Sequence, residues 1–168
     1  EAEQVFRECL DVVRNTVGIE HPRAAKLLTA YCEMLADLGR PEEGVTLISE
    51  ALTASEQRYG KAVPWRLRLI SVGVISAVNA KKYEMASALG EQALASLETR
   101  VQPFGRDEGI DLANMAHKLG DLSDMTLCRK AYGRVFALNQ RQNDLEELWT
   151  DNLNFGGSLA EHKFYVDA

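Results

Sequence analysis

The chain has 168 residues, of which 46% are hydrophobic and 26% are charged, and its formal net charge is −6. This hydrophobic fraction supports a packed core and excludes a disordered tail, and no apolar run reaches the roughly 18 residues that a membrane-spanning helix needs. Residues 61–105 carry 6 basic and 3 acidic residues between two acidic ends. This charge pattern lacks the basic face of a general nucleic-acid-binding protein.

Apolar residues recur at helical spacings from the beginning of the chain, and no strand-like alternation of useful length occurs. The pattern predicts helices over 1–17, 22–38, 41–60, 64–79, 83–101 and 105–119, a seventh ending near 139, and a shorter one over 145–153. Glycine and proline mark the boundaries, as at Gly39 and Pro41. We expect Gly156 and Gly157 to end the last helix, and we assign no structure to the last eleven residues.

A spacing of 42 residues relates several of these boundaries and apolar positions. The matching residues are Gly18 and Gly60, Pro22 and Pro64, and Leu10, Leu52 and Leu94. A fixed period of this size is typical of stacked helical repeats. Each helix pair would have apolar faces on two sides, so it must stack on the next pair to bury them.

Three motifs carry a family resemblance. Val17-Gly18-Ile19-Glu20-His21-Pro22 returns in degraded form at 59–64, a glycine turn stands at Leu38-Gly39-Arg40-Pro41-Glu42-Glu43-Gly44, and small-then-large pairs occur at Cys9-Leu10, Ala51-Leu52, Ala93-Leu94 and Ala131-Tyr132. These motifs resemble the tetratricopeptide family over about residues 1–140, in particular the long-period variant of the kinesin light chain. A weaker similarity is to the helical C-terminal modules of methyltransferases with a MYND finger and a SET domain. The resemblance implies an all-α fold, a right-handed α-solenoid of stacked antiparallel helix pairs.

In this register the chain divides into a half repeat and three pairs. The half repeat covers 1–18, the pairs cover about 22–60, 64–102 and 105–140, and 141–168 forms a C-terminal capping helix and tail. From Ala93 to Ala131 is 38 residues, so we expect the third pair to have lost four. The aromatic residues of the last segment either cap the final pair or contact a partner. These residues are Trp149, Phe155, Phe164 and Tyr165.

In proteins of this resemblance the first helices of the pairs line a concave groove that holds an extended peptide or a partner helix. The basic residues Lys26, Arg68 and Arg106 then stand near the starts of these helices. The other groove positions are Thr29, Glu33, Ser71, Ile75, Asn79, Ala113 and His117. A row of cations would suit an acidic peptide; alternatively, the three are solvated first-turn residues. Trp65 is either a packing residue or an exposed hot spot for binding.

Nothing in the sequence indicates catalysis. There is no nucleophile paired with a base and no phosphate-binding glycine loop. His21, His117 and His162 lack metal-ligand spacing, and His21 is expected to be a turn residue. The acidic residues Asp144, Glu146, Glu147 and Asp151 are expected on a solvated helix face. Cys9, Cys32 and Cys128 fall on apolar helical positions and indicate reduced, buried thiols in an intracellular, cytoplasmic protein.

These observations predict a non-catalytic protein–protein interaction module, a scaffold or adaptor without a cofactor or metal, that binds a protein or peptide. The alternative is a regulatory or positioning arm of a larger enzyme such as a SET-domain methyltransferase. Because Glu1 falls inside a helical pattern, we expect the chain to be part of a longer protein.

Overall fold

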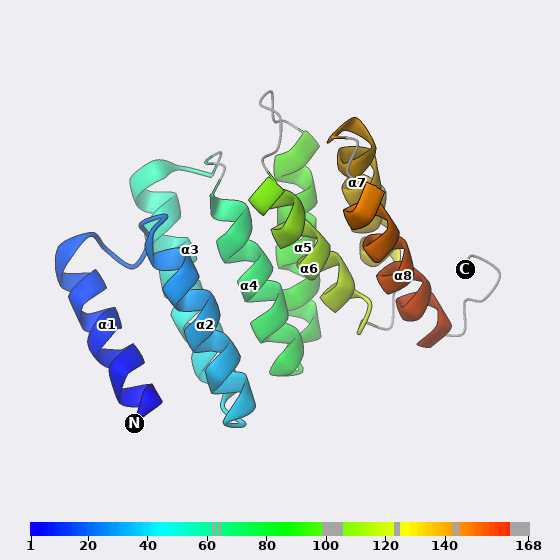
Figure 1. Ribbon diagram of the computed structural model, residues 1–168. Coiled ribbons are helices and arrows are strands. Elements are labelled where there is room, and N and C mark those ends of the chain that lie inside the picture. The colour runs from blue at the N-terminus through cyan, green and yellow to red at the C-terminus, as the bar shows by residue number, and fades with distance from the viewer. Residues whose placement is uncertain (62, 64, 99–105, 123–124, 143–144, 162–168) are drawn as a thin grey trace.

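The structure is a computed structural model that describes the chain except for residues 62, 64, 99–105, 123–124, 143–144 and 162–168 (Figure 1). The elements are α1 (Ala2–Thr16), α2 (Ala24–Asp37), α3 (Pro41–Tyr59), α4 (Arg66–Asn79), α5 (Tyr83–Glu98), α6 (Arg106–Leu119), α7 (Thr126–Gln142) and α8 (Leu145–Glu161). The described residues contain no strand, so the predicted all-α fold is confirmed. The chain breaks expected at Pro103 and Gly105 lie outside the described residues.

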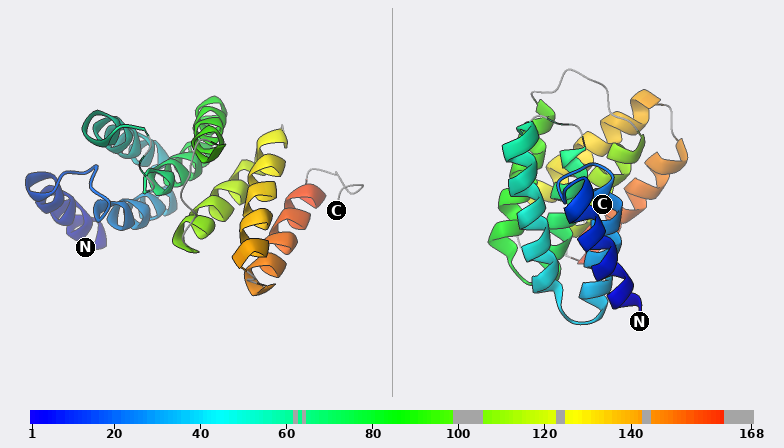
Figure 2. Two further views of the ribbon diagram at one scale, coloured as in Figure 1. Left: turned by 90° about the horizontal axis from the view of Figure 1, so that it is seen from above. Right: turned by 90° about the vertical axis from the view of Figure 1, so that its left-hand side faces the viewer.

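The helices run alternately up and down and follow one another across the molecule in chain order (Figure 1). Each helix packs against its neighbour in sequence, and α4 also packs against α2 and α6. As a result, α2, α4 and α6 line one face, with α3 and α5 behind them (Figure 2). No helix among the described residues is long and apolar enough to cross a membrane.

The turns at the ends of α2 and α4 repeat the same backbone geometry 42 residues apart. Both helices have 14 residues, and both end in a residue of positive φ, Gly39 at 73° and Lys81 at 58°. The amide–carbonyl pairs are Leu38–Met34, Gly39–Ala36 and Arg40–Leu35 in the first turn, and Ala80–Ser76, Lys81–Val78 and Lys82–Ala77 in the second. These hydrogen bonds satisfy carbonyls that the end of a helix leaves free, so the 42-residue period is present in the backbone as well as in the sequence.

The buried positions keep the 42-residue spacing through α7. In α2, α4 and α6 they are Leu28, Ile70 and Leu112, then Cys32, Val74 and Ala116, then Leu35, Ala77 and Leu119. In α3, α5 and α7 they are Gly44, Ala86 and Cys128, then Ile48, Gly90 and Tyr132, then Ala51, Ala93 and Val135. Ala93 therefore corresponds to Val135 and not to Ala131, and the expected loss of four residues is not found. Residues four apart share a helix face, so a small-then-large pair one turn early was mistaken for the equivalent position.

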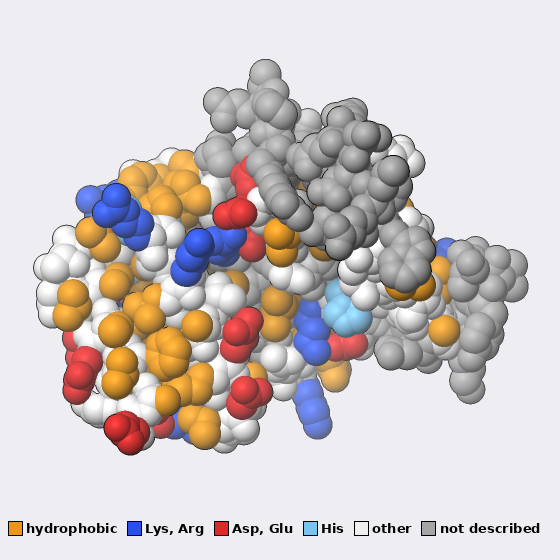
Figure 3. All heavy atoms as spheres, in the orientation of Figure 1, with side chains coloured by type: hydrophobic (Ala, Val, Ile, Leu, Met, Phe, Trp, Pro, Cys, Tyr) orange, Lys and Arg blue, Asp and Glu red, His pale blue; other side chains and the backbone are white. Residues whose placement is uncertain are grey.

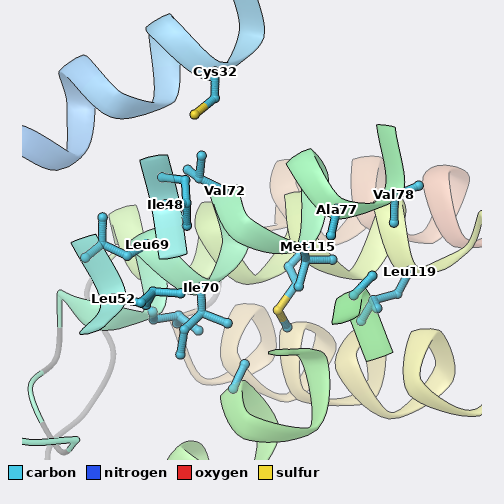
Figure 4. Packing of buried hydrophobic residues seen from close by; sticks show 14 of the residues in the cluster. Cys32, Ile48, Leu52, Leu69, Ile70, Val72, Ala77, Val78, Met115 and Leu119 are labelled. Atoms are coloured by element: carbon cyan, nitrogen blue, oxygen red, sulfur yellow. The ribbon is translucent and has the colours of Figure 1, made fainter. Parts of the chain in front are cut away.

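Glycines let the helices around α4 approach closely. A Cβ added at Gly73 of α4 would lie 3.0 Å from Leu89 Cδ1 of α5 and 3.1 Å from Ile48 Cγ2 of α3. A Cβ at Gly44 would lie 3.4 Å from Cys32 Sγ. Figure 4 shows the cluster in which buried side chains of α2, α3, α4 and α6 meet. The core is therefore continuous from one helix pair to the next.

The last helix is longer than predicted. Gly156 and Gly157 do not end it, because α8 continues to Glu161. Each glycine costs about 1 kcal/mol in a helix, but Leu159 is fully buried, which contributes roughly 1.5–3 kcal/mol. Phe155 packs against the rings of Tyr132 and Phe136 of α7, with centroids 4.9 and 5.9 Å away.

Two further expectations for the C-terminal segment can be compared with the structure. Asp151 is buried in α8, at 4% exposure, whereas a solvated face was predicted. Phe164, Tyr165 and His162 lie outside the described residues, as does the side chain of Trp149. The contacts of α8 with α6 and α7 nevertheless cover one side of the last pair.

Candidate partner-binding site

The predicted groove positions lie on α2, α4 and α6, which contact one another in order. Glu33, Ile75 and His117 are 42 residues apart, one on each helix. Glu33 and His117 are exposed and Ile75 is half-buried. We call these three residues the central row. A partner lying across the three helices would meet one residue of the row on each.

The three basic residues of the predicted groove do not form a row. At the 42-residue spacing, Lys26 and Arg68 correspond to Ile110, which is 42% exposed. Arg106 is the first residue of α6, four residues before that position, and its side chain lies outside the described residues. Lys26 is exposed, as either of its two predicted roles requires. The repeated cation that suggested an acidic partner is therefore absent at the third helix.

Arg68 is instead part of a polar contact that holds α4 to α6. Its Nε donates to both carboxylate oxygens of Asp111, at 3.1 and 3.0 Å, and its Nη2 lies 3.6 Å from Asp107 Oδ2. The hydroxyl of Ser71 donates to the backbone oxygen of Asp111 at 2.7 Å. Burial raises the pKa of Asp111, and the Arg68 guanidinium offsets part of that rise. Arg68 and Ser71 thus serve packing between neighbouring pairs in this structure.

The remaining groove positions surround the central row. Thr29 donates to the backbone oxygen of Ala25 at 2.9 Å and is half-buried, as is Ala113. Asn79 is exposed at the end of α4. It lines a cavity of about 520 Å³ together with Asp37 and Glu42. Asn79 is therefore open to a ligand, whereas Thr29 uses its hydroxyl within its own helix.

Trp65 precedes α4 and packs edge-on against Tyr59, with ring centroids 5.2 Å apart. It is half-buried against the core. Arg66, the next residue, is only 4% exposed and lies 3.1 Å from Glu56 Oε2. These contacts give Trp65 a packing role at the start of α4 and leave part of its surface accessible.

A second cavity, of about 380 Å³, lies between α1 and α3 over Leu10, Tyr31 and Leu35. Its rim is charged, but the charges are matched within the chain. Arg14 pairs with Glu50 at 2.7 Å, and Arg7, also on the rim, pairs at 2.7 Å with Glu3 of its own helix. The cavity offers a ligand no unpaired cation among these arginines.

The sequence did not reveal an exposed apolar face on α1. Val5 is 54% exposed and Val12 is 62% exposed, and Ala2 and Cys9 are also exposed. Cys9 was predicted to be buried, so that expectation is wrong, whereas Cys32 and Cys128 are buried as predicted. The missed signal is the period itself: Ala2 and Cys9 stand 42 residues before the buried Gly44 and Ala51.

The described residues provide little for metal or thiol chemistry. They contain no group of three or more histidine, cysteine or acidic side chains arranged to hold a metal. The Nδ1 of His21 accepts a hydrogen bond from the Arg23 amide at 3.2 Å, consistent with a turn residue. Burial raises the pKa of the Cys32 thiol to about 11 and that of Cys128 to about 12. Both are therefore protonated near neutral pH and poor nucleophiles.

Neither a protein-family model nor a curated protein matches this sequence. The argument for function therefore depends on the geometry of the chain itself.

Proposed function

We propose that the chain is a non-catalytic protein–protein interaction module, a scaffold built as a right-handed α-solenoid of tetratricopeptide-like helix pairs. The observation that carries this proposal is the 42-residue recurrence of the turn hydrogen bonds and of the buried positions. Such a stack presents equivalent residues at regular intervals along an extended face, and proteins of this architecture use that face for binding.

The proposed binding surface is the central row, with Lys26 and Asn79 beside it. Packed helices lie about 8–10 Å apart, so a row across three helices spans about 20 Å, the length of about six extended residues. The row combines a carboxylate, an aliphatic side chain and an imidazole. Because Arg68 is paired with Asp111, this surface fits a peptide with both apolar and polar side chains better than a uniformly acidic one.

The experiment is affinity capture followed by mass spectrometry with two matched double variants. Ile75→Glu with His117→Glu places two acidic side chains in the central row. Thr53→Glu with Ala95→Glu places two on exposed positions of α3 and α5, which lie behind that face. We expect the first variant to lose the captured partner and the second to retain it, with both folded by circular dichroism. Retention of the partner by both variants would refute the role of the row.

A further inference from the structure

Helix α1 lacks a neighbour that the equivalent helices have. In α3, α5 and α7 the positions of Ala51, Ala93 and Val135 are 0–1% exposed, and Gly44, Ala86 and Cys128 are all buried. In α3 these residues face α2, as the close approach of Gly44 to Cys32 shows. The equivalent residues of α1 are Cys9 and Ala2, and both are exposed. The chain thus contains a second-type helix without the first-type helix that covers it elsewhere.

Only half of the apolar surface of α1 is covered. Phe6 stacks on Tyr31 of α2, with ring centroids 5.4 Å apart, and Leu10 is buried. The other half, formed by Ala2, Val5, Cys9 and Val12, is exposed. Among the helices, α1 packs only against α2.

The uncovered surface continues onto α2. Leu27 and Met34 are half-buried and lie one turn on either side of Tyr31, so they share its face of the helix. Figure 3 shows hydrophobic side chains gathered over α1 and α2 on the face toward the viewer. We call this surface, from Val5 and Cys9 of α1 to Leu27 and Met34 of α2, the N-terminal groove.

We propose that the N-terminal groove binds one amphipathic helix of a partner protein, which lies on α1 as α2 lies on α3. The chain itself contains the template for this contact. The covering helix α2 presents Leu28, Tyr31, Cys32 and Leu35 as its buried stripe, at spacings of three and four. Helix-in-groove recognition uses the same anchor spacing. The small residues Ala2 and Cys9 would allow close approach, as Gly44 and Ala51 do for α2.

The charges around the groove fix the direction and chemistry of the occupant. Antiparallel to α1, the occupant runs parallel to α2, so its C-terminal half lies beside the first half of α1 and the second half of α2. Glu8, Glu33 and Asp37 stand there and are exposed, and none forms an ion pair with a described residue. Lysine or arginine in the C-terminal half of the occupant would complement them, which the helix dipole also favours.

The same charges disfavour a second copy of this chain as the occupant. If α1 of another molecule entered the groove, its C-terminal half would bring Glu8 and Asp11 against these carboxylates. Like charges across a desolvated contact are unfavourable. This groove and the central row are different surfaces, so the proposal goes beyond the proposed function and does not require it.

The test uses Cys9, the exposed thiol in the groove, as its reporter. The probe is the segment 24–37 carrying Cys32→Ala, Glu33→Lys and Asp37→Lys, fused ahead of Glu1 through a flexible glycine–serine linker that gives a millimolar effective concentration. The control fusion carries Cys32→Ala alone and keeps both acidic residues. Reaction of Cys9 with a maleimide is then timed at neutral pH, with Cys9→Ala as the blank.

We expect the basic fusion to slow the reaction of Cys9 by about tenfold relative to the unfused chain, and the acidic fusion to slow it less. Val5→Asp, at an exposed position, should restore the rate of the basic fusion without unfolding the chain. Equal rates for the unfused chain and the basic fusion would overturn the proposal. So would protection of Cys9 in the unfused chain that rises with protein concentration, because that result assigns the groove to a second copy. The Ile75 and His117 variants do not enter this test, so the two proposals fail separately.

Discussion

Leucine introduced at one repeat position in three helices gives a direct test of the register. Ala51 of α3 and Ala93 of α5 are 0% exposed, and Cys9 is the equivalent, exposed residue of α1. Leucine adds three carbons to alanine and differs little from it in helix propensity. At the two buried positions these carbons have no space, so Ala51→Leu and Ala93→Leu should each lower the free energy of unfolding by about 1–3 kcal/mol. Cys9→Leu should change it by less than about 0.5 kcal/mol.

The assay is urea unfolding followed by circular dichroism, with tryptophan fluorescence as a second probe because stacked repeats can unfold in parts. With a slope of about 2 kcal/mol per molar urea, the two buried variants should lower the midpoint by about 1 M. The midpoint for Cys9→Leu should stay within about 0.25 M of the wild-type value. If Cys9→Leu destabilises the chain as much as Ala51→Leu does, the 42-residue register does not extend to α1, and the argument for an uncovered helix fails.

Other predictions concern the turns, the thiols and an open glycine. Gly39→Ala should cost about 1 kcal/mol in urea unfolding, whereas Lys81→Gly at the equivalent turn should stabilise by a similar amount, because both positions have positive φ. At pH 8 a thiol reagent should titrate Cys9 alone in the native chain and all three cysteines in denaturant, since the pKa values of Cys32 and Cys128, about 11 and about 12, keep both protonated; rapid native reaction of a second thiol would contradict this. Gly133→Ala, where an added Cβ meets nothing within 4 Å, should raise the free energy of unfolding by about 0.5–1 kcal/mol.

Local sequence was sufficient for the elements and their turns. The predicted helix 41–60 is observed as α3, at Pro41–Tyr59, because a proline can begin a helix and a glycine can end one within a few residues of chain. The first predicted pair begins at Pro22, and α2 starts at Ala24. The repeat was also visible, since Gly18 and Gly60 are the same residue in the same positive-φ conformation.

The sequence was ambiguous wherever the answer depended on a choice between positions on one helix face. Ala131 and Val135 are one turn apart and both buried, so spacing alone selected the wrong equivalent of Ala93. The end of α8 depended on a similar competition. Gly156 and Gly157 disfavour a helix locally, and only the burial of Leu159 against the preceding helices outweighs them.

The candidate site depended still more on the tertiary structure. Arg68 was recognisable as a cation near the start of a helix, but its pairing with Asp111 required α6 to lie beside α4. The exposure of Cys9 likewise followed from the absence of a covering helix among the described residues and not from its own apolar neighbourhood. The sequence by itself determined the helices, their turns and their period, because backbone conformation and apolar spacing act over a few residues. Which faces are covered and which charges are neutralised was decided only when distant helices came into contact, because burial and ion pairing belong to pairs of surfaces and not to single segments.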